Sequence, residues 1–172
     1  GALVRLVLFF GRSLGLTADM GRVRSLSRRW MPIGRRIVVV GGGLVGVELA
    51  EFLTERGRAV TVLEEGEDLA TEMAHPRRWR TLHEARRHGV AFQTGATVTG
   101  ITTTHVEYRL GDGTHRAVAD TVVLAGGIQP DASLGERIRE ATGLDVDVIG
   151  DAATTGYIQG AIRSGNRAAN AL

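Results

Sequence analysis

An uninterrupted succession of strand, glycine-rich loop, helix and strand in residues 37–63 restricts the fold more than any other feature. Residues 37–40 form a β-branched run, which is typical of a strand buried on both faces of a parallel sheet. Residues 41–46 read Gly-Gly-Gly-Leu-Val-Gly and match the pattern G-x-G-x-x-G. Residues 44–56 place apolar and charged side chains on opposite sides of a helix, and residues 59–63 are a second apolar run. This order predicts a βαβ unit with two adjacent parallel strands.

The composition of the loop suits the diphosphate of a dinucleotide. Gly41 would form the tight turn, Gly43 would let the diphosphate approach the main chain, and Gly46 would let the helix pack closely against the strand. The free N–H groups at the start of the helix carry about half a positive charge, which attracts an anion. The alternative is a glycine-rich turn in an α/β domain that binds nothing. The residues predicted to bind the cofactor here are Gly41, Gly42, Gly43, Leu44, Val45 and Gly46.

An acidic residue after the second strand indicates which dinucleotide fits. Glu64 lies 18 positions beyond Gly46, where a carboxylate can accept hydrogen bonds from the adenosine ribose hydroxyls of NAD. The 2′-phosphate of NADP would face the same carboxylate. Two like unit charges about 4 Å apart repel by about 1 kcal/mol in water and about 4 kcal/mol at a surface-like dielectric. No arginine follows the strand directly, and Glu65 is interpreted as a solvated loop residue, so the sequence predicts NAD(H) over NADP(H).

The rest of the chain predicts how this unit is completed. Pro76 fits the first turn of a helix that runs to about residue 88, because proline lacks the N–H that a helix start leaves unpaired. Closely spaced β segments and an Asp112-Gly113 turn signal predict a β-meander laid across the parallel sheet. The expected fold class is α/β, a Rossmann-like dinucleotide-binding domain with a parallel sheet, crossover helices and this meander. The predicted strands are residues 90–92, 97–104, 105–110, 114–119, 121–124 (buried) and 146–149, and the later helices are residues 134–141 and 160–172.

Residues 1–34 carry a weaker pattern. An apolar cluster at residues 3–10 is followed by several arginines and then by Trp30, Met31 and Pro32. We expect one or two short helices or an irregular connector here, with a boundary at residues 32–34.

The composition excludes several classes of chemistry. The 172 residues contain no cysteine, which excludes disulfides, thiolate metal sites and iron–sulfur ligation within this sequence. The five histidines have no metal-like spacing with acidic residues, so no metal site is predicted. All 21 basic residues are arginines that alternate with acidic and apolar residues, which indicates solvated helix faces and no nucleic-acid patch. No segment approaches about 18 consecutive apolar residues, so no membrane span is predicted and we expect a cytoplasmic protein.

Further segments, taken in order with the loop, are similar to a known family. Residues 38–50 resemble the NAD(P)-binding domain of flavoprotein reductases that have two dinucleotide-binding domains. Residues 122–130 (Val-Val-Leu-Ala-Gly-Gly-Ile-Gln-Pro) resemble the segment that crosses from the NAD domain to the FAD domain, and residues 148–151 (Val-Ile-Gly-Asp) resemble the second FAD-binding motif. Residues 69–78 and 156–162 make the chain most similar to the C-terminal half of the NADH:flavin oxidoreductase family, which includes 2,4-dienoyl-CoA reductase and trimethylamine dehydrogenase.

The resemblance implies a role for residues in each matched segment. Glu48 would lie near the contact between the nicotinamide and the flavin. Asp151 would hydrogen-bond the ribityl chain of FAD, with Gly150 allowing close approach. Gly126 and Gly127 would lie where the chain crosses into the FAD domain.

The resemblance also implies a division into domains. Residues 1–34 would be a connector or a remnant of a split FAD domain, residues 35–125 the NAD(H)-binding domain, and residues 126–172 the returning segment of the FAD-binding domain. In the family, an N-terminal barrel carries FMN, cysteines hold a 4Fe–4S cluster, and hydride passes from NAD(P)H to FAD and onward as single electrons. This sequence has no cysteine and no second G-x-G-x-x-G for the FAD diphosphate. We therefore expect FAD to bind only when the rest of its domain is supplied, with the FMN/iron–sulfur and FAD modules as missing partners.

Two functions stay open at this point. The first is the NAD(H)-binding portion of a flavin-dependent oxidoreductase that passes hydride from NADH to FAD, with the isolated chain catalytically incomplete. The second is a non-catalytic module that binds or senses NAD(H). A structural remnant with an empty loop is the third and simplest interpretation.

Overall fold

The computed structural model describes residues 5, 9 and 19–171, and they form two compact units that divide after Gly126. One or two short helices or an irregular connector were predicted for residues 1–34, of which positions 1–4, 6–8 and 10–18 lie outside the described residues. The first described helix is α2 (Met20–Arg29), which begins where the Asp19 side chain accepts a hydrogen bond from the backbone N–H of Gly21. Within the described residues, every helix falls short of the length and apolar character that crossing a bilayer requires.

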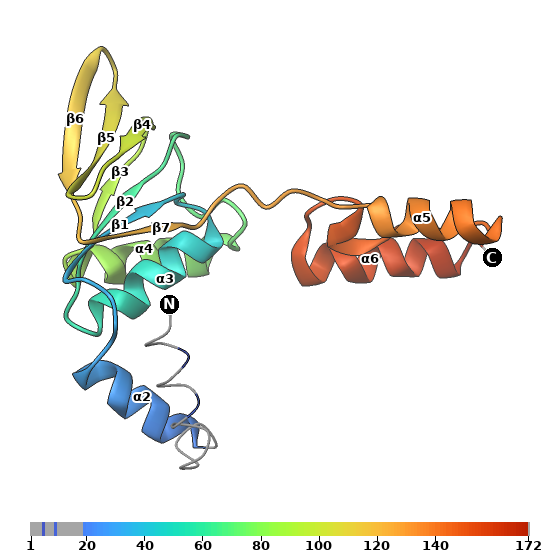
Figure 1. The fold of residues 1–172 in the computed structure, drawn as a ribbon, viewed down its shortest axis with the longest axis horizontal. Helices are drawn as coiled ribbons and strands as arrows, with labels where there is room; N and C mark the ends of the chain where they lie inside the picture. Colours follow the sequence, from blue (N-terminus) through green and yellow to red (C-terminus); the bar gives the residue numbers. More distant parts are fainter. Residues whose placement is uncertain (1–4, 6–8, 10–18, 172) are drawn as a thin grey trace. The chain divides into compact units, whose positions relative to one another are not determined.

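A parallel sheet of four strands is the centre of the first unit (Figure 1). Its strand order is β3-β2-β1-β7, and all three pairings are parallel. Helix α3 (Leu44–Thr54) connects β1 to β2, and helix α4 (His75–Arg87) connects β2 to β3. The predicted βαβ unit and parallel sheet are therefore confirmed. The strands are β1 (Arg36–Val40), β2 (Ala59–Leu63), β3 (Ala91–Gln93) and β7 (Thr121–Leu124).

Both faces of β1 are buried, which explains its unbroken β-branched sequence. Ile37 and Val39 pack with α3 and α4 on one face, in a cluster that includes Ala50 and Ala85. Val38, between them, points to the opposite face and packs against the meander. Figure 1 shows the two helices on one side of the sheet and the meander on the other. Because successive strand residues face opposite ways, a strand covered on both sides needs apolar side chains at every position.

The meander forms a separate antiparallel sheet of β4 (Ala96–Ile101), β5 (His105–Leu110) and β6 (Gly113–Val118). Leu110 pairs with Gly113, so the turn residues are Gly111 and Asp112, one position before the predicted Asp112-Gly113 turn. Gly111 has a φ of +57°, and the first central position of such a turn favours glycine for that reason. The meander itself is confirmed.

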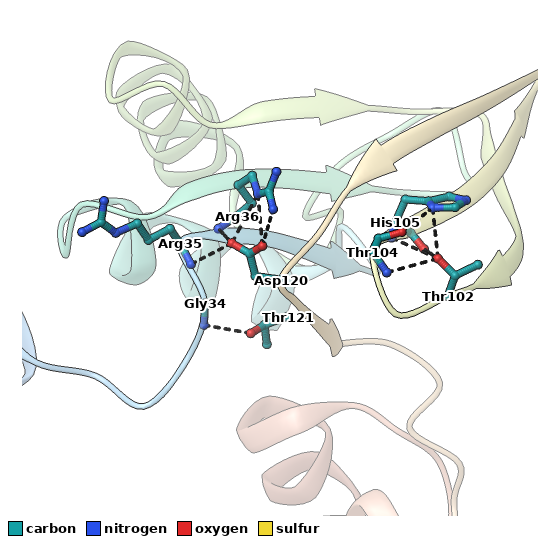
Figure 2. Close-up of polar contacts among 8 residues, drawn as sticks. All are labelled: Gly34, Arg35, Arg36, Thr102, Thr104, His105, Asp120 and Thr121. Atoms are coloured by element: carbon teal, nitrogen blue, oxygen red, sulfur yellow. Dashed lines mark hydrogen bonds and ion pairs between the residues drawn. The ribbon is translucent and has the colours of Figure 1, made fainter.

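Side chains of the first unit tie the beginning of β1 to the beginning of β7 (Figure 2). Asp120 accepts hydrogen bonds from the backbone N–H groups of Arg35 (3.2 Å) and Arg36 (3.0 Å) and forms an ion pair with the Arg36 guanidinium. These donors lower the pKa of Asp120 to about 2. Gly34 N–H donates to Thr121 Oγ1 at 2.9 Å. The same figure shows the β4–β5 turn, where Thr102 Oγ1 accepts from His105 N–H at 3.1 Å.

Two predicted strands differ from the structure. Residues 121–124 do form β7, but β7 is an edge of the described sheet and Leu124 is 70% exposed, so the strand is half-buried and not buried. Residues 146–149 form no strand, because no described strand hydrogen-bonds to them and an isolated segment leaves its backbone groups without ladder partners.

The second unit consists of α5 (Ser133–Thr142), the short 3-10 helix η1 (Gly150–Ala152) and α6 (Tyr157–Ala169). Helix α6 begins three residues earlier than predicted from sequence. None of residues 127–171 is buried.

Candidate functional site

The candidate site is the corner where β1 leaves the sheet and α3 begins. Gly41 has a φ of +107°, a backbone conformation that favours glycine. Its N–H donates to Leu63 O at 2.8 Å, which ties the loop to the end of β2. A Cβ built on Gly41 would lie 2.9 Å from Gly126 N, so the backbone segments at the ends of β1 and β7 touch here.

Gly46 sits in the first turn of α3, against the loop. A Cβ built on it would lie 1.9 Å from Gly41 O and 3.5 Å from Ala125 Cβ. No side chain fits in that space. The contact is the close helix-to-strand packing expected from the third glycine of the pattern.

Gly43 is the N-cap residue of α3 and has no side chain with which to cap it. A Cβ built on Gly43 would lie 2.8 Å from Glu72 Oε1, and Leu44 N–H donates to Glu72 Oε2 at 3.1 Å. A carboxylate from the loop after β2 therefore stands at the positive end of the helix. Sequence reasoning gave Glu72 no role of its own, because nothing local relates it to a helix that begins 28 positions earlier.

Glu64 is the first residue after β2, at the beginning of the segment that also carries Glu72. Its Oε2 accepts from Gly42 N–H at 2.5 Å, and its Oε1 accepts from Gly66 N–H at 2.8 Å. The residue is half-buried. The structure thus brings Glu64 to the glycine loop, as expected for an acid at the end of the neighbouring parallel strand.

The segment that carries Glu72 is anchored beside the loop. Ala70 N–H donates to Gly42 O at 2.8 Å, and Ala70 takes a positive φ of +48°. Leu69, Ala70 and Met73 are buried with residues of α3 and α4. Arg78 Nε donates to Leu69 O at 2.6 Å. These contacts fix the backbone on both sides of Glu72.

Glu48 is exposed on α3, one turn after the loop. Its Oε1 lies 2.5 Å from Arg77 Nη2, and both side chains are more than 40% exposed. An exposed pair of this kind contributes about 0–1 kcal/mol to stability. Val45, also in the first turn of α3, is 45% exposed.

Of the remaining predicted residues, Gly127, Gly150 and Asp151 belong to the second unit. Gly127 and Gly150 both have positive φ, +80° and +65°. Asp151 Oδ1 accepts from the backbone N–H groups of Gly156 (2.8 Å) and Tyr157 (2.9 Å), at the start of α6. Gly150 N–H donates to Ser164 Oγ at 2.9 Å. Each of these contacts lies within the second unit. Gly126, the last residue of the first unit, lies against Gly41 of the loop.

The corner fits an anionic diphosphate on three grounds. Gly43 leaves a space that only the end of a flexible side chain enters, and the start of α3 presents N–H groups to that space. A carboxylate already occupies it, which shows that the position accepts negative charge. Within residues 5, 9 and 19–171 no group of three or more His, Cys, Asp or Glu side chains could hold a metal ion.

A parallel sheet with a glycine-rich loop at the start of its crossover helix, and an acid at the end of the next strand, defines a dinucleotide-binding domain of the Rossmann type. Comparison with known proteins agrees: the model of the pyridine nucleotide-disulphide oxidoreductase family matches residues 11–162. The chain belongs to that family. Members of the family bind NAD(H) and FAD, and the chain is an oxidoreductase domain of this flavoprotein type.

Similar curated proteins are much longer than this chain. The NADH oxidase of Thermoanaerobacter brockii is 38% identical over 130 residues, which cover 75% of this chain and 20% of the oxidase. The bilirubin reductase of Mediterraneibacter gnavus is 36% identical over 148 residues, which cover 86% of this chain and 23% of the reductase. The chain therefore spans about a fifth to a quarter of the length of these relatives.

Solved structures give the same result for the fold. A complex of 2-naphthoyl-CoA reductase with 2-naphthoyl-CoA is similar at a TM-score of 0.70 and 26% identity, over 78% of this chain and 21% of that one. Histamine dehydrogenase from Rhizobium sp. 4-9 is similar at a TM-score of 0.72 and 20% identity, over 81% of this chain and 23% of that one. The second likeness shows the fold alone.

Proposed function

We propose that residues 35–125 bind NADH and present it as the hydride donor to FAD in a flavin-dependent oxidoreductase. The observation that carries the proposal is the Gly41–Gly46 corner with Glu64 held against it. In this arrangement the N–H groups at the start of α3 bind the diphosphate, and the Glu64 carboxylate accepts hydrogen bonds from the ribose hydroxyls. When bound, NADH supplies the hydride. The cytoplasm, expected from the sequence, stays the predicted location.

The remaining segments follow from the same proposal. Residues 126–172 would be the returning part of a split FAD-binding domain, with Gly150 and Asp151 on the flavin side, and Glu48 near the nicotinamide. FAD and FMN/iron–sulfur modules would complete the enzyme. The lengths of the relatives support this, because each is several times longer than the matched segment.

A finer family assignment within this proposal is the NADH:flavin oxidoreductase group, with 2,4-dienoyl-CoA reductase and trimethylamine dehydrogenase. Similarity to 2-naphthoyl-CoA reductase supports it, since the TM-score of 0.70 covers 78% of this chain. The bacillithiol disulfide reductase of Bacillus cereus is similar only at a TM-score of 0.54, over 61% of this chain.

The choice of cofactor is tested at Glu64. We expect the full chain to bind NADH at least about tenfold more tightly than NADPH, because the 2′-phosphate adds repulsion of about 1–4 kcal/mol per unit charge against Glu64. Glu64→Arg should reverse the preference, since an arginine there attracts the phosphate. Glu65→Arg changes the net charge equally at the next position and serves as the matched control. Fluorescence titration measures the affinities of the parent and of both variants for NADH and for NADPH, and equal affinities of the parent for the two nucleotides would refute this role.

The loop assignment is tested at Gly43. Gly43→Val should abolish NADH binding and leave the fold intact, because the new side chain enters the diphosphate space and meets only the end of Glu72. Gly100→Val in β4 is the control, since a Cβ there meets Glu107 at an ordinary 3.6 Å, away from the loop. Retained NADH affinity in Gly43→Val would contradict the loop assignment.

A non-catalytic NAD(H)-binding or sensing module is the second candidate. The sequence contains one G-x-G-x-x-G and no second loop for the FAD diphosphate, which favours binding without flavin chemistry by these 172 residues alone. Both candidates predict NADH binding. The test uses the protein purified from its natural source and not the 172-residue chain alone. Flavin released on denaturing that protein, together with NADH-dependent bleaching of its yellow colour, would favour the oxidoreductase. A colourless protein from the same source that binds NADH would favour the sensor.

A further inference from the structure

The Glu72 carboxylate occupies the place that the nucleotide site keeps for phosphate. Leu44 N–H, at the start of α3, donates to its Oε2 at 3.1 Å. Independently, its Oε1 lies 2.8 Å from the position that a Cβ built on Gly43 would take. The first contact places negative charge at the positive end of the helix. The second places it in the space that is open because residue 43 is a glycine. A carboxylate in this position makes the interaction that a phosphate oxygen makes.

We infer that Glu72 is an internal competitor of the dinucleotide diphosphate and sets the affinity of the site. The inference rests on the proposed function. The carboxylate and the diphosphate are both anions and use the same N–H groups, so they cannot occupy the corner together. Binding therefore requires the Glu72 side chain to rotate away from α3.

Only the side chain moves, because its backbone is held on both sides. Ala70 is 1% exposed and donates its N–H to Gly42 O, and Met73 is 7% exposed in the same buried cluster. Glu72 itself is exposed, so its carboxylate can turn into solvent without opening the core. The competitor thus stays tethered beside the loop in both states and acts at a high local concentration.

The competition has opposite consequences for stability and for binding. In the free protein the carboxylate stabilises the start of α3. In the complex it contributes nothing there and repels the diphosphate. A loss of its charge should therefore make the free protein less stable and the complex tighter, and a purely structural loop residue would not produce this pair of opposite changes.

The test compares the full 172-residue chain with Glu72→Gln and Glu72→Ala. We expect NADH to bind roughly threefold to tenfold more tightly to both variants, with the larger gain for Ala, which keeps no acceptor. Thermal unfolding without nucleotide should show lower midpoints for both. Glu67→Gln removes the same charge from the same loop, is exposed, and should change neither quantity.

Two further ligands locate the competition. ADP-ribose contains the diphosphate and should show the same gain as NADH, whereas adenosine lacks it and should show none. Parent-like or weaker NADH affinity in both Glu72 variants, with the parent still binding, overturns the inference and leaves the proposed function standing. Failure of every folded variant and of the parent to bind NADH or ADP-ribose overturns the proposed function itself.

Discussion

The two units of the chain differ in how many apolar side chains each of them buries. Among the described residues up to Gly126, buried apolar side chains form three clusters, on both faces of the parallel sheet and beside the loop. Within residues 127–171, by contrast, no residue is buried, and Ile158 and Ile162 of α6 are 80% and 67% exposed. Packing is the main stabilising term for a helix in water, so α5 and α6 have little of it from their own unit.

This difference separates two kinds of predicted site residue. Gly41, Gly46 and Glu64 are held by contacts between segments far apart in sequence, backed by a core. Gly150 and Asp151 form hydrogen bonds within the second unit, to partners at most 14 positions away. The geometry of the corner at Gly41–Gly46 thus depends on the first unit as a whole, whereas the geometry around Asp151 depends on nearby residues.

Two matched isoleucines provide the largest test of this comparison. Ile37→Ala in β1, where the side chain is 1% exposed, should lower the free energy of unfolding by about 2–5 kcal/mol. Ile162→Ala in α6, where it is 67% exposed, should change it by less than about 0.5 kcal/mol. Urea unfolding followed by circular dichroism measures both. A cost for Ile162→Ala as large as that for Ile37→Ala would show that the second unit has a core.

Two matched glycines test the corner itself. Gly46→Ala should lower the free energy of unfolding by about 2 kcal/mol, since overpacking of about 3 kcal/mol exceeds the gain in helix propensity of about 1 kcal/mol. The cause is the 1.9 Å approach to Gly41 O, which only a shift of the backbone relieves. Gly43→Ala, whose φ of −67° suits any residue, should cost less than about 0.5 kcal/mol. Equal losses in the same urea assay would mean that helix and loop do not pack closely.

The sequence was sufficient for the first unit where local pattern and tertiary structure agree. The run at residues 37–40, the glycine loop and the acid at Glu64 each carry a signal within a few residues, and the fold class they predict is the one observed. The role of Glu72 had no such signal, because its position depends on how a later loop folds back onto α3. The turn at Ala70 had no such signal either, because its positive φ is taken by an alanine and not by a glycine.

Errors in the sequence reading have equally specific causes. Residues 146–149 are as apolar as a strand, but strand formation also needs a hydrogen-bonding neighbour, which periodicity does not reveal. Residues 121–124 have the composition of a buried strand and pair on one side only among the described strands. The turn at Gly111 and Asp112 was misplaced by one residue because two glycines flank Asp112, and only the register shows which one takes positive φ.

A smaller effect is expected when the pH is lowered, at the contact of Asp120 with Arg36 in the first unit. The pKa of Asp120 falls from 3.8 to about 2, mainly because Arg36 donates hydrogen bonds to the ionised carboxylate. A lowered pKa means that its stabilisation is complete above pH 3.8 and is lost as the pH falls toward about 2. Asp120→Asn should therefore be less stable than the parent above pH 3.8, with the difference shrinking in acid. Asp145→Asn, an exposed residue of the second unit, is the control; parallel pH profiles of parent and Asp120→Asn would contradict the assignment.

The smallest expected effect lies at Asp151, where the comparison between the units is sharpest. Asp151→Ala removes the acceptor for Gly156 and Tyr157 N–H, a cap of about 1 kcal/mol at the start of α6. Because none of residues 127–171 is buried, no core resists the change, and hydrogen exchange should become roughly fivefold faster at these two amides and their neighbours in α6. Amides of β1 and β2 should exchange at the parent rate. Equal acceleration in β1 would mean that α6 and the parallel sheet unfold as one cooperative body, and that the local character assigned to the Asp151 contacts is wrong.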